Sequence, residues 1–368
     1  MTTERDRAID ALRAIAILGV VLGHWLVTAV VVPGDGTVRV ASPLRAVPWL
    51  APASWLFQTL ALFFFVGGMV AARSTIDRYG AWLRARLVRL FRPVAALLAV
   101  WTVLLLAVPG TSFASRTVLK LVASPLWFLL VFAALTAATP LLRRLHPVWP
   151  LAVVAAVDLA RFALGAPAWL GWVNLAAGWL VPFSLGMSWT RGAFRSRTTA
   201  WLMFTLGFAA TAALCLGAGY PVSMVGVPGE GVSNLNPPTL AAVTFGIGQC
   251  GAALLLMPAL RRVMQRPRPW LVVAAVNLSA MTIFLWHQTA LILVTLLSPA
   301  PLPGLHTPPV DASWLPERLL WLPVFALVLL VCWRLFLRFE HRGLTPAALK
   351  LAHQAPSAPA GGQLPYRA

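Results

Sequence analysis

Two histidines lie within long apolar stretches of this sequence, where a polar side chain is costly to keep. The first, His24, follows Arg13 by eleven residues. Eleven residues make almost three α-helical turns, so both side chains share one helix face about 16 Å apart, with Asp10 beside Arg13. An imidazole in apolar surroundings stays neutral, and a neutral imidazole is a competent general base. The spacing therefore predicts base catalysis by His24; the alternative is a core histidine bonded to a hydroxyl or a carbonyl.

The second histidine, His287, lies in the segment MTIFLWHQTAL. Counted from Trp270, it is about 17 residues into its helix, and His24 is about 16 residues into its own, so both lie about 24–26 Å from the same side of a membrane. The matching depth allows His287 to orient His24 or to contact a substrate. The alternative is a structural hydrogen bond between helices.

The densest basic run is RYGAWLRARLVRLFR at 78–92. Arg86 and Arg89 are three residues apart, so their guanidinium groups lie side by side on a helix. Planar guanidinium forks suit bidentate binding of phosphate oxygens. The run therefore predicts a phosphate site; the alternative is a topology signal that also touches anionic lipid headgroups. Asn234 and Asn236, in SNLNPPT, either line an outward-facing site or only shape a turn.

The rest of the sequence excludes several chemistries. The ten carboxylates include no intramembrane pair of the kind that glycosidases use. There is no HExxH, Walker loop, GxSxG elbow or GxGxxG followed by an acidic residue, and no ligand cluster for a metal. We therefore expect no bound metal or cofactor, and histidine is the base that the sequence offers.

The elements that position these residues follow from composition. Hydrophobic residues make up 60% of the 368 residues and charged residues only 11%, against roughly 25% in soluble proteins. This excludes a soluble enzyme, and also a nucleic-acid-binding protein, despite the net charge of +19. A membrane helix needs about 20 mainly apolar residues. The sequence predicts ten such runs, and hence an all-α polytopic transmembrane helix bundle: 9–31, 52–72, 93–108, 124–142, 148–163, 168–190, 199–219, 239–260, 270–297 and 318–338.

Charge sets the orientation of this bundle. Of the 29 lysines and arginines, 23 fall on the side of the N-terminus, and the other six, Arg318 among them, fall in the opposite segments. Positive residues resist translocation, so the N-terminal side is cytoplasmic, and ten helices place both termini there. Residues 1–345 then form one transmembrane domain, and 346–368 are expected to be a disordered cytoplasmic tail. We expect a multi-pass protein of the cell membrane.

Several segments resemble the acyltransferase-3 family of integral-membrane acyltransferases. DALRAIAILGVVLGH at 10–24 is similar to the family's opening helix, and RLVRLFRP at 86–93 is similar to its RxxR motif. FFFVGG at 63–68 resembles its second-helix segment, with Gly67 where many members carry serine. Three later segments are similar to further family helices: PLWFLLVFAALTAATP at 125–140, PFSLGM at 182–187 and NLSAMTIFLWH at 277–287. The resemblance covers essentially the whole chain.

The resemblance implies an acyl-CoA-dependent O-acyltransferase. Such an enzyme moves an acyl group, often acetyl, from cytoplasmic acyl-CoA to a hydroxyl of a glycan, a glycosylated metabolite or a lipid. Arg86 and Arg89 would then hold the phosphates of the donor. Neutral His24 would take the proton from the acceptor hydroxyl.

The same resemblance gives the other polar residues of these helices a place. Arg13 and Asp10 would line and orient the path of the donor, and His287 would orient His24 or contact the acceptor. Direct transfer and a relay through an acyl-histidine are both open. The expected partners are acyl-CoA, the hydroxyl-bearing acceptor and the lipid bilayer, with no nucleic acid. The alternative function is a multi-span transporter of small solutes or lipids without acyl transfer.

Overall fold

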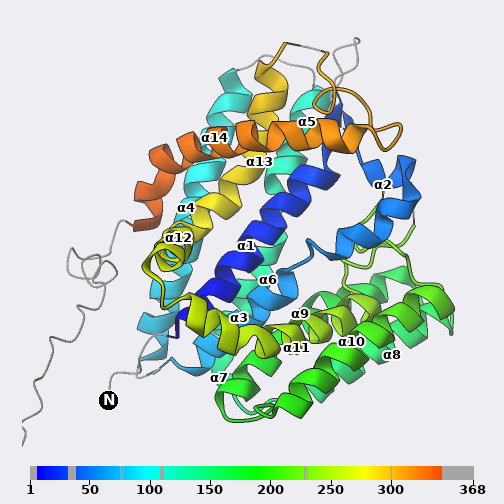
Figure 1. Ribbon diagram of the computed structural model, residues 1–368, viewed down its shortest axis with the longest axis vertical. Coiled ribbons are helices and arrows are strands. Elements are labelled where there is room, and N and C mark those ends of the chain that lie inside the picture. The colour runs from blue at the N-terminus through cyan, green and yellow to red at the C-terminus, as the bar shows by residue number, and fades with distance from the viewer. Residues whose placement is uncertain are drawn as a thin grey trace, which may run out of the picture.

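The computed structural model describes residues 6–31, 39–74, 76, 78–107, 112–227, 229, 231–299 and 301–341. Helices make up almost all of its regular structure (Figure 1), and the described strands β1 (Ala29–Val31) and β2 (Arg39–Ala41) form one short antiparallel ladder. The predicted all-α bundle is confirmed, while the predicted tail 346–368 lies outside the described residues. The helices are α1 (Arg7–Val27), α2 (Pro43–Ala46), α3 (Leu60–Ala72), α4 (Tyr79–Ala107), α5 (Ser112–Ala123), α6 (Leu126–Ala137), α7 (Thr139–Leu142), α8 (Val148–Phe162), α9 (Val173–Thr190), α10 (Arg197–Gly217), α11 (Leu240–Val263), α12 (Pro267–Leu278), α13 (Ala280–Leu297) and α14 (Trp314–His341), with 3-10 turns η1 (Pro48–Trp55) and η2 (Ala168–Trp172).

Nine segments of the described chain are long and apolar enough to cross a membrane. They correspond to nine of the ten predicted runs. The other run, 148–163, forms α8, whose 15 residues fall short of the roughly 20 that a full crossing needs. The nine segments are Arg7–Val27, Pro48–Ala72, Tyr79–Ala107, Arg116–Ala137, Ala168–Thr190, Arg197–Gly217, Leu240–Val263, Ala280–Leu297 and Trp314–Glu340.

Helices α1 and α3 connect two groups of helices (Figure 1). On one side, α13 packs against α1, α4 and α14. On the other, α8, α9 and α11 pack against one another, α10 packs against α11, and α3 contacts both α9 and α11. The helix that carries His24 therefore lies between the group that carries His287 and the rest of the bundle.

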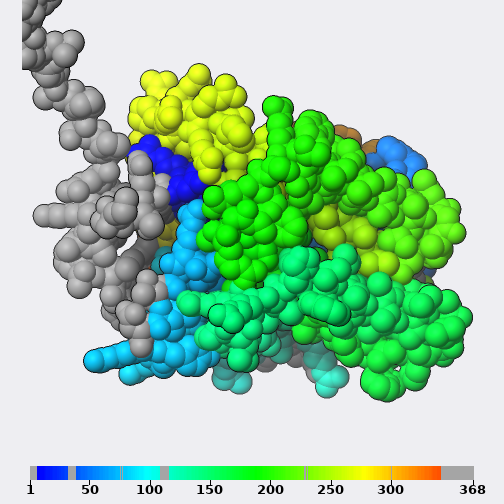
Figure 2. Space-filling model, turned by 90° about the horizontal axis from the view of Figure 1, so that it is seen from below, coloured from blue at the N-terminus to red at the C-terminus, as the bar shows by residue number. Residues whose placement is uncertain are grey.

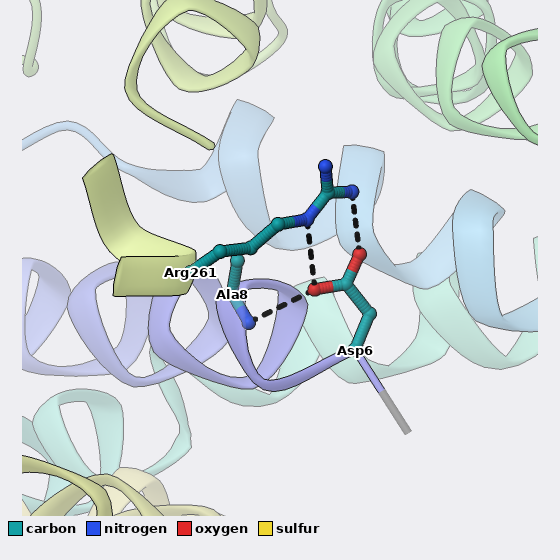
Figure 3. Close-up of polar contacts among 3 residues, drawn as sticks. All are labelled: Asp6, Ala8 and Arg261. Atoms are coloured by element: carbon teal, nitrogen blue, oxygen red, sulfur yellow. Dashed lines mark hydrogen bonds and ion pairs between the residues drawn. The ribbon is translucent and has the colours of Figure 1, made fainter. Parts of the chain in front are cut away.

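The start of α1 is fixed to the end of α11. Asp6 is the N-cap residue of α1, and its Oδ1 accepts a hydrogen bond from Ala8 N at 3.1 Å. Arg261 of α11 donates from Nη2 to Oδ2 of the same carboxylate at 2.8 Å and from Nε to Oδ1 at 3.5 Å (Figure 3). A carboxylate at a helix start also favours the helix dipole. These contacts determine where α1 begins and so where the residues further along it lie.

Helices α3 and α9 cross at backbone contact because each carries a glycine there. A Cβ on Gly68 would collide with the carbonyl oxygen of Phe183, and a Cβ on Gly186 would collide with that of Phe65. Both obstacles are backbone atoms, which no side-chain rotation can move away. Small residues at a crossing allow membrane helices to approach this closely.

Gly186→Ala is expected to destabilise the bundle by about 1–3 kcal/mol or more, because the added methyl group forces α3 and α9 apart. The thermal unfolding temperature of the detergent-solubilised protein measures the effect. Gly217→Ala, at the end of α10, is the control, since nothing lies within 4 Å of its added Cβ. An unchanged unfolding temperature for Gly186→Ala would contradict the close crossing.

The structure corrects the prediction of one continuous helix over 270–297. α12 ends at Leu278 and α13 begins at Ala280. Polar side chains at the break have partners outside their own helix: Asn277 Nδ2 donates to Asp10 O at 2.7 Å, and Ser279 Oγ accepts from Trp333 Nε1 at 2.5 Å. Hydropathy alone does not reveal such contacts, because they join residues far apart in the sequence.

The new helix start at Ala280 is capped by the last turn of α14. Glu340 Oε1 accepts from Met281 N at 3.2 Å, and its Oε2 accepts from Thr282 N at 3.0 Å and from Thr282 Oγ1 at 2.7 Å. The first amides of a helix have no partner within it, and a carboxylate supplies one while favouring the helix dipole. The break therefore leaves the start of α13 fixed to α14.

Candidate active site

The last turn of α1 and the middle of α13 bring the two histidines together. The ring centroids of His24 and His287 are 5.1 Å apart, and the ring planes are inclined by 45°. His287 is fully buried, whereas His24 is partly exposed. The two side chains thus lie at one depth in the bundle, as their positions in the sequence predict.

Two reciprocal contacts hold α1 and α13 in this register. The indole Nε1 of Trp25 donates to His287 O at 3.0 Å. The side-chain amide of Gln288 lies 3.0 Å from His24 Nδ1. Neighbouring residues of one helix are therefore paired with neighbouring residues of the other, which restricts sliding between the two helices.

The His287 ring has a defined proton position. Its Nδ1 lies 2.6 Å from Phe284 O, and a carbonyl oxygen can only accept, so Nδ1 carries the proton. In a neutral ring the other nitrogen, Nε2, then presents a lone pair. Within the described part of the chain this buried Nε2 has no hydrogen-bond partner. His287 Nε2 is therefore an unpaired acceptor in a fully buried ring beside His24, and this ring does not line the cavity that His24 lines.

His24 lines a cavity of about 380 Å³, within the size range of small-molecule sites. Asn236 lines the same cavity. Asn234 is fully buried in the adjoining loop, where its Nδ2 donates to Pro221 O at 2.6 Å and to Ser223 O at 2.9 Å. Of the two asparagines, Asn236 is placed to meet a ligand and Asn234 shapes the loop. The other lining residues are Val20, Gly23, Val27, Ser54, Phe57, Gln58, Leu60, Ser124, Pro125, Trp127, Phe128, Val225, Gly226, Ser233, Leu235 and Phe284.

Asp10 and Arg13 lie in the first half of α1, and neither lines this cavity. Asp10 is buried, Arg13 is half-buried, and both have interaction partners in the structure. Helix rise places Arg13 about 16 Å from His24 along α1. If Asp10 and Arg13 take part in the reaction, they therefore act along the path that leads to the histidine pair and not at the pair itself.

The arginine pair lies near the start of α4. Arg86 is half-buried and donates from Nη2 to Ser74 Oγ at 2.7 Å, and its guanidinium lies 4.8 Å from the Trp82 ring centre. Arg89 is exposed, and its positive charge repels that of Arg86. An anion bound between them would relieve this repulsion. Figure 2 shows the segment at the start of α4 (light blue), the start of α1 (dark blue) and α12 (yellow) on one face of the molecule.

A further guanidinium joins this pair. Arg143, just after α7, donates from Nη2 to the backbone oxygen of Ser74 at 3.0 Å, so Arg86 and Arg143 converge on one residue. The sequence analysis missed both Ser74 and Arg143. Arg143 looked only like part of a topology signal, since nothing in its spacing connects it with a residue almost 70 positions earlier.

The arginine pair and the histidine pair are separated along α4. Trp101 of α4 donates from Nε1 to Thr289 Oγ1 at 3.0 Å, next to Gln288. Arg86 precedes Trp101 by fifteen residues, which is about 22 Å along a helix axis. A substrate anchored at Arg86 and reacting at His24 must therefore have a long, flexible arm.

Arg318 is a buried residue that the sequence analysis counted only as an outer-segment charge. Its side chain is fully buried. Nε donates to Trp25 O at 2.7 Å, Nη2 to Thr28 O at 2.7 Å and Nη1 to Gly304 O at 3.1 Å. One guanidinium thus ties α14 to the end of α1, one turn from His24. The sequence signal that could have indicated this burial was the position of Arg318 at the start of an apolar run.

The described residues contain no group of three or more His, Cys, Asp or Glu side chains placed to hold a metal ion. The titratable groups nearest the cavity are the two imidazoles. The chemistry that this arrangement offers is therefore proton transfer at His24, with hydrogen bonding by His287 and Asn236.

The fold and the cavity together describe a multi-pass membrane protein with a histidine in the wall of a cavity. Residues 6–337 match the family profile described as the acyltransferase domain, Acyl_transf_3. The match covers most of the chain, so the chain belongs to the acyltransferase-3 family and is a membrane acyltransferase. It matches no curated protein and no solved structure. Membership favours an enzyme over the alternative of a transporter without acyl transfer.

Proposed function

We propose that this protein transfers an acyl group, in the simplest case acetyl, from acyl-CoA at the cytoplasmic face to a hydroxyl of a glycan, a glycosylated metabolite or a lipid. The observation that carries the proposal is the placement of His24 in the wall of a cavity, with His287 beside it. The enzyme works in the cell membrane. Acyl-CoA is its co-substrate, and no resident cofactor takes part.

The donor is held by its charged end. Arg86 and Arg89, with Arg143 nearby, bind the phosphates, because paired guanidinium groups form bidentate, charge-assisted hydrogen bonds with phosphate oxygens. The pantetheine arm then runs along α4 toward the histidines, past the half of α1 that carries Arg13 and Asp10. The separation of about 22 Å between Arg86 and the level of Thr289 suits such an arm.

At the histidine pair, His24 acts as general base. Its Nε2 takes the proton of the acceptor hydroxyl as the oxygen attacks the thioester carbonyl. The new C–O bond forms, the C–S bond breaks, and His24 returns the proton to the departing CoA sulfur. Asn236 and the bare Nε2 of His287 contact the acceptor or orient His24. In the relay variant, a His24 nitrogen carries the acyl group between donor and acceptor.

The direct test uses the purified protein in lipid nanodiscs with acetyl-labelled acetyl-CoA. Supplied with an envelope glycolipid extract, the protein should move label into the acceptor fraction and release free CoA in equal amount. Labelled protein trapped by acid quench would favour the relay. Absence of both products, across acetyl and longer acyl donors, would overturn the proposed function.

Arg89→Ala is expected to raise KM for acetyl-CoA about ten- to a hundredfold while leaving kcat within about threefold. A lost charge-assisted hydrogen bond costs roughly 1.5–3 kcal/mol, and this loss falls on donor binding. Arg86→Ala should likewise raise KM and leave kcat nearly unchanged. It should also lower the stability somewhat, because the hydrogen bond from Arg86 to Ser74 is lost. Initial rates against donor concentration measure both.

The matched control is Arg84→Ala, an exposed arginine of the same helix. It should leave both constants unchanged. Equal changes in all three variants would indicate that the run acts only through its total charge, and no change in any of them would leave it as a topology signal.

A further inference from the structure

We propose that Gln288 is the positioning residue of His24: its side-chain oxygen accepts the Nδ1 proton of the imidazole and leaves Nε2 bare toward the cavity. This inference rests on the proposed function, in which His24 is the base. It adds a third member to the site, with a defined part in directing the proton.

The contact itself is short and enclosed. The amide nitrogen of Gln288, Nε2, is placed 3.0 Å from His24 Nδ1, and Gln288 is 1% exposed. Nδ1 is therefore committed to Gln288, and Nε2 is the ring nitrogen left for the cavity. Because Nδ1 faces the Gln288 amide, the orientation of this amide determines which ring nitrogen carries the proton.

A half-turn of the Gln288 amide exchanges its NH₂ and its oxygen without changing its shape. With NH₂ toward Nδ1, the ring must carry its proton on Nε2, and this nitrogen cannot accept another from a hydroxyl. With the oxygen toward Nδ1, the proton sits on Nδ1 and Nε2 has a lone pair. Either orientation leaves one amide atom without a partner among the described residues, where Oε1 is now the unpaired atom.

The reaction distinguishes the two orientations. Once His24 has taken the acceptor proton, both of its ring nitrogens are donors. With the Gln288 oxygen toward the ring, Nδ1–H has an acceptor both before and after proton transfer. With the NH₂ group toward the ring, two donors face each other once His24 is protonated. A base at this position therefore works with the Gln288 oxygen facing it.

The backbone of α13 keeps Gln288 in place. His287 O, on one side, accepts from Trp25 Nε1 at 3.0 Å, and Thr289 Oγ1, on the other, accepts from Trp101 Nε1 at 3.0 Å. His287 and Gln288 thus contact α1, and Thr289 contacts α4. A residue fixed on both sides can orient a neighbour without itself contacting the substrate.

The test compares Gln288→Glu with Gln288→Met in the nanodisc acetyl-transfer assay. Ionised glutamate has the same length as glutamine and offers only acceptor oxygens, so kcat should stay within about threefold. Methionine fills the space without a strong acceptor, and kcat should fall roughly ten- to a hundredfold, the cost of removing an orienting partner of a histidine. KM for acetyl-CoA should not change in either variant.

Two further variants keep the test decisive. Thr295→Val, on the same helix, removes a hydroxyl whose one hydrogen bond among the described residues is to Leu291 O, and it should retain full kcat. Gln288→Asn keeps the amide but is one methylene too short to reach His24; it should match the methionine variant, and it serves if the latter does not fold.

Full kcat in both Gln288→Met and Gln288→Asn would overturn the positioning role. Equal loss in the glutamate and methionine variants, at wild-type unfolding temperature, would overturn the assignment of the oxygen as the acceptor. The proposed function fails in a different way, through the absence of acetyl transfer by the wild type or its retention in His24→Ala.

Discussion

Replacing His24 with alanine is expected to lower kcat for acyl transfer by about 10²–10⁴-fold, the usual contribution of a positioned general base. Donor binding should remain, because Arg86 lies about 22 Å along α4 from Trp101, whose indole contacts Thr289 beside the His24 partner Gln288. Single-turnover rates with labelled acetyl-CoA and a separate CoA-binding measurement would show this split.

The control for His24→Ala is His146→Ala. His146 is exposed and lies just before α8, where its Nδ1 accepts from Val148 N at 3.3 Å. This variant should keep wild-type turnover. If His24→Ala folds and turns over at a wild-type rate, His24 is not the base, and the neighbouring imidazole of His287 becomes the first residue to test.

The second large effect is expected on stability, for Arg318→Met. Methionine avoids the cost of burying a guanidinium, but it leaves the oxygens of Trp25, Thr28 and Gly304 without their donors. Each buried carbonyl that loses its partner costs about 1–3 kcal/mol, so the sum of three exceeds what an apolar side chain returns. We expect a loss of about 3 kcal/mol or more, measured as a lower thermal unfolding temperature in detergent.

Arg318→Lys should be intermediate, because an ammonium keeps the charge but lacks the planar fork that reaches three oxygens. Arg338→Met, at an exposed position of the same helix, is the control and should change stability little. Equal unfolding temperatures for Arg318→Met and Arg338→Met would show that the buried contacts contribute nothing net.

The all-α fold could be predicted from the sequence because a membrane allows few kinds of secondary structure. Apolar runs of sufficient length must be helical, since the bilayer core offers no partners for backbone amides. The break at Ser279 could not be predicted in this way. It depends on Asn277, Ser279 and Glu340 meeting atoms of α1, α14 and α13, and these encounters exist only in the packed bundle.

The site was predictable where one helix carries it. Arg13 and His24 share α1, and the spacing that relates them is local; Arg86 and Arg89 share α4 in the same way. The matching depth of His24 and His287 in the membrane predicted that His287 belongs to the site. This prediction did not depend on the helix break between α12 and α13. Gln288 needed more, since a glutamine in an apolar helix is most often a bond between helices.

Partners supplied from remote segments escaped prediction altogether. Ser74 with Arg143, and Arg318 with the end of α1, are pairs whose members are separated by many tens of residues. No periodicity connects them. The sequence shows the charges of Arg143 and Arg318. Each charge could be explained by the orientation of the chain in the membrane as well as by a specific contact.

The contacts of α14 have a consequence for how the enzyme comes into being. Arg318 at its beginning grips the end of α1, and Glu340 at its end caps the start of α13. During synthesis His24 leaves the ribosome well before Gln288, Arg318 and Glu340, which follow it by more than 260 residues. Helix α1 must therefore wait in the bilayer until α13 and α14 have been made. The contacts among His24, Gln288 and Arg318 can therefore form only after α14 has been made.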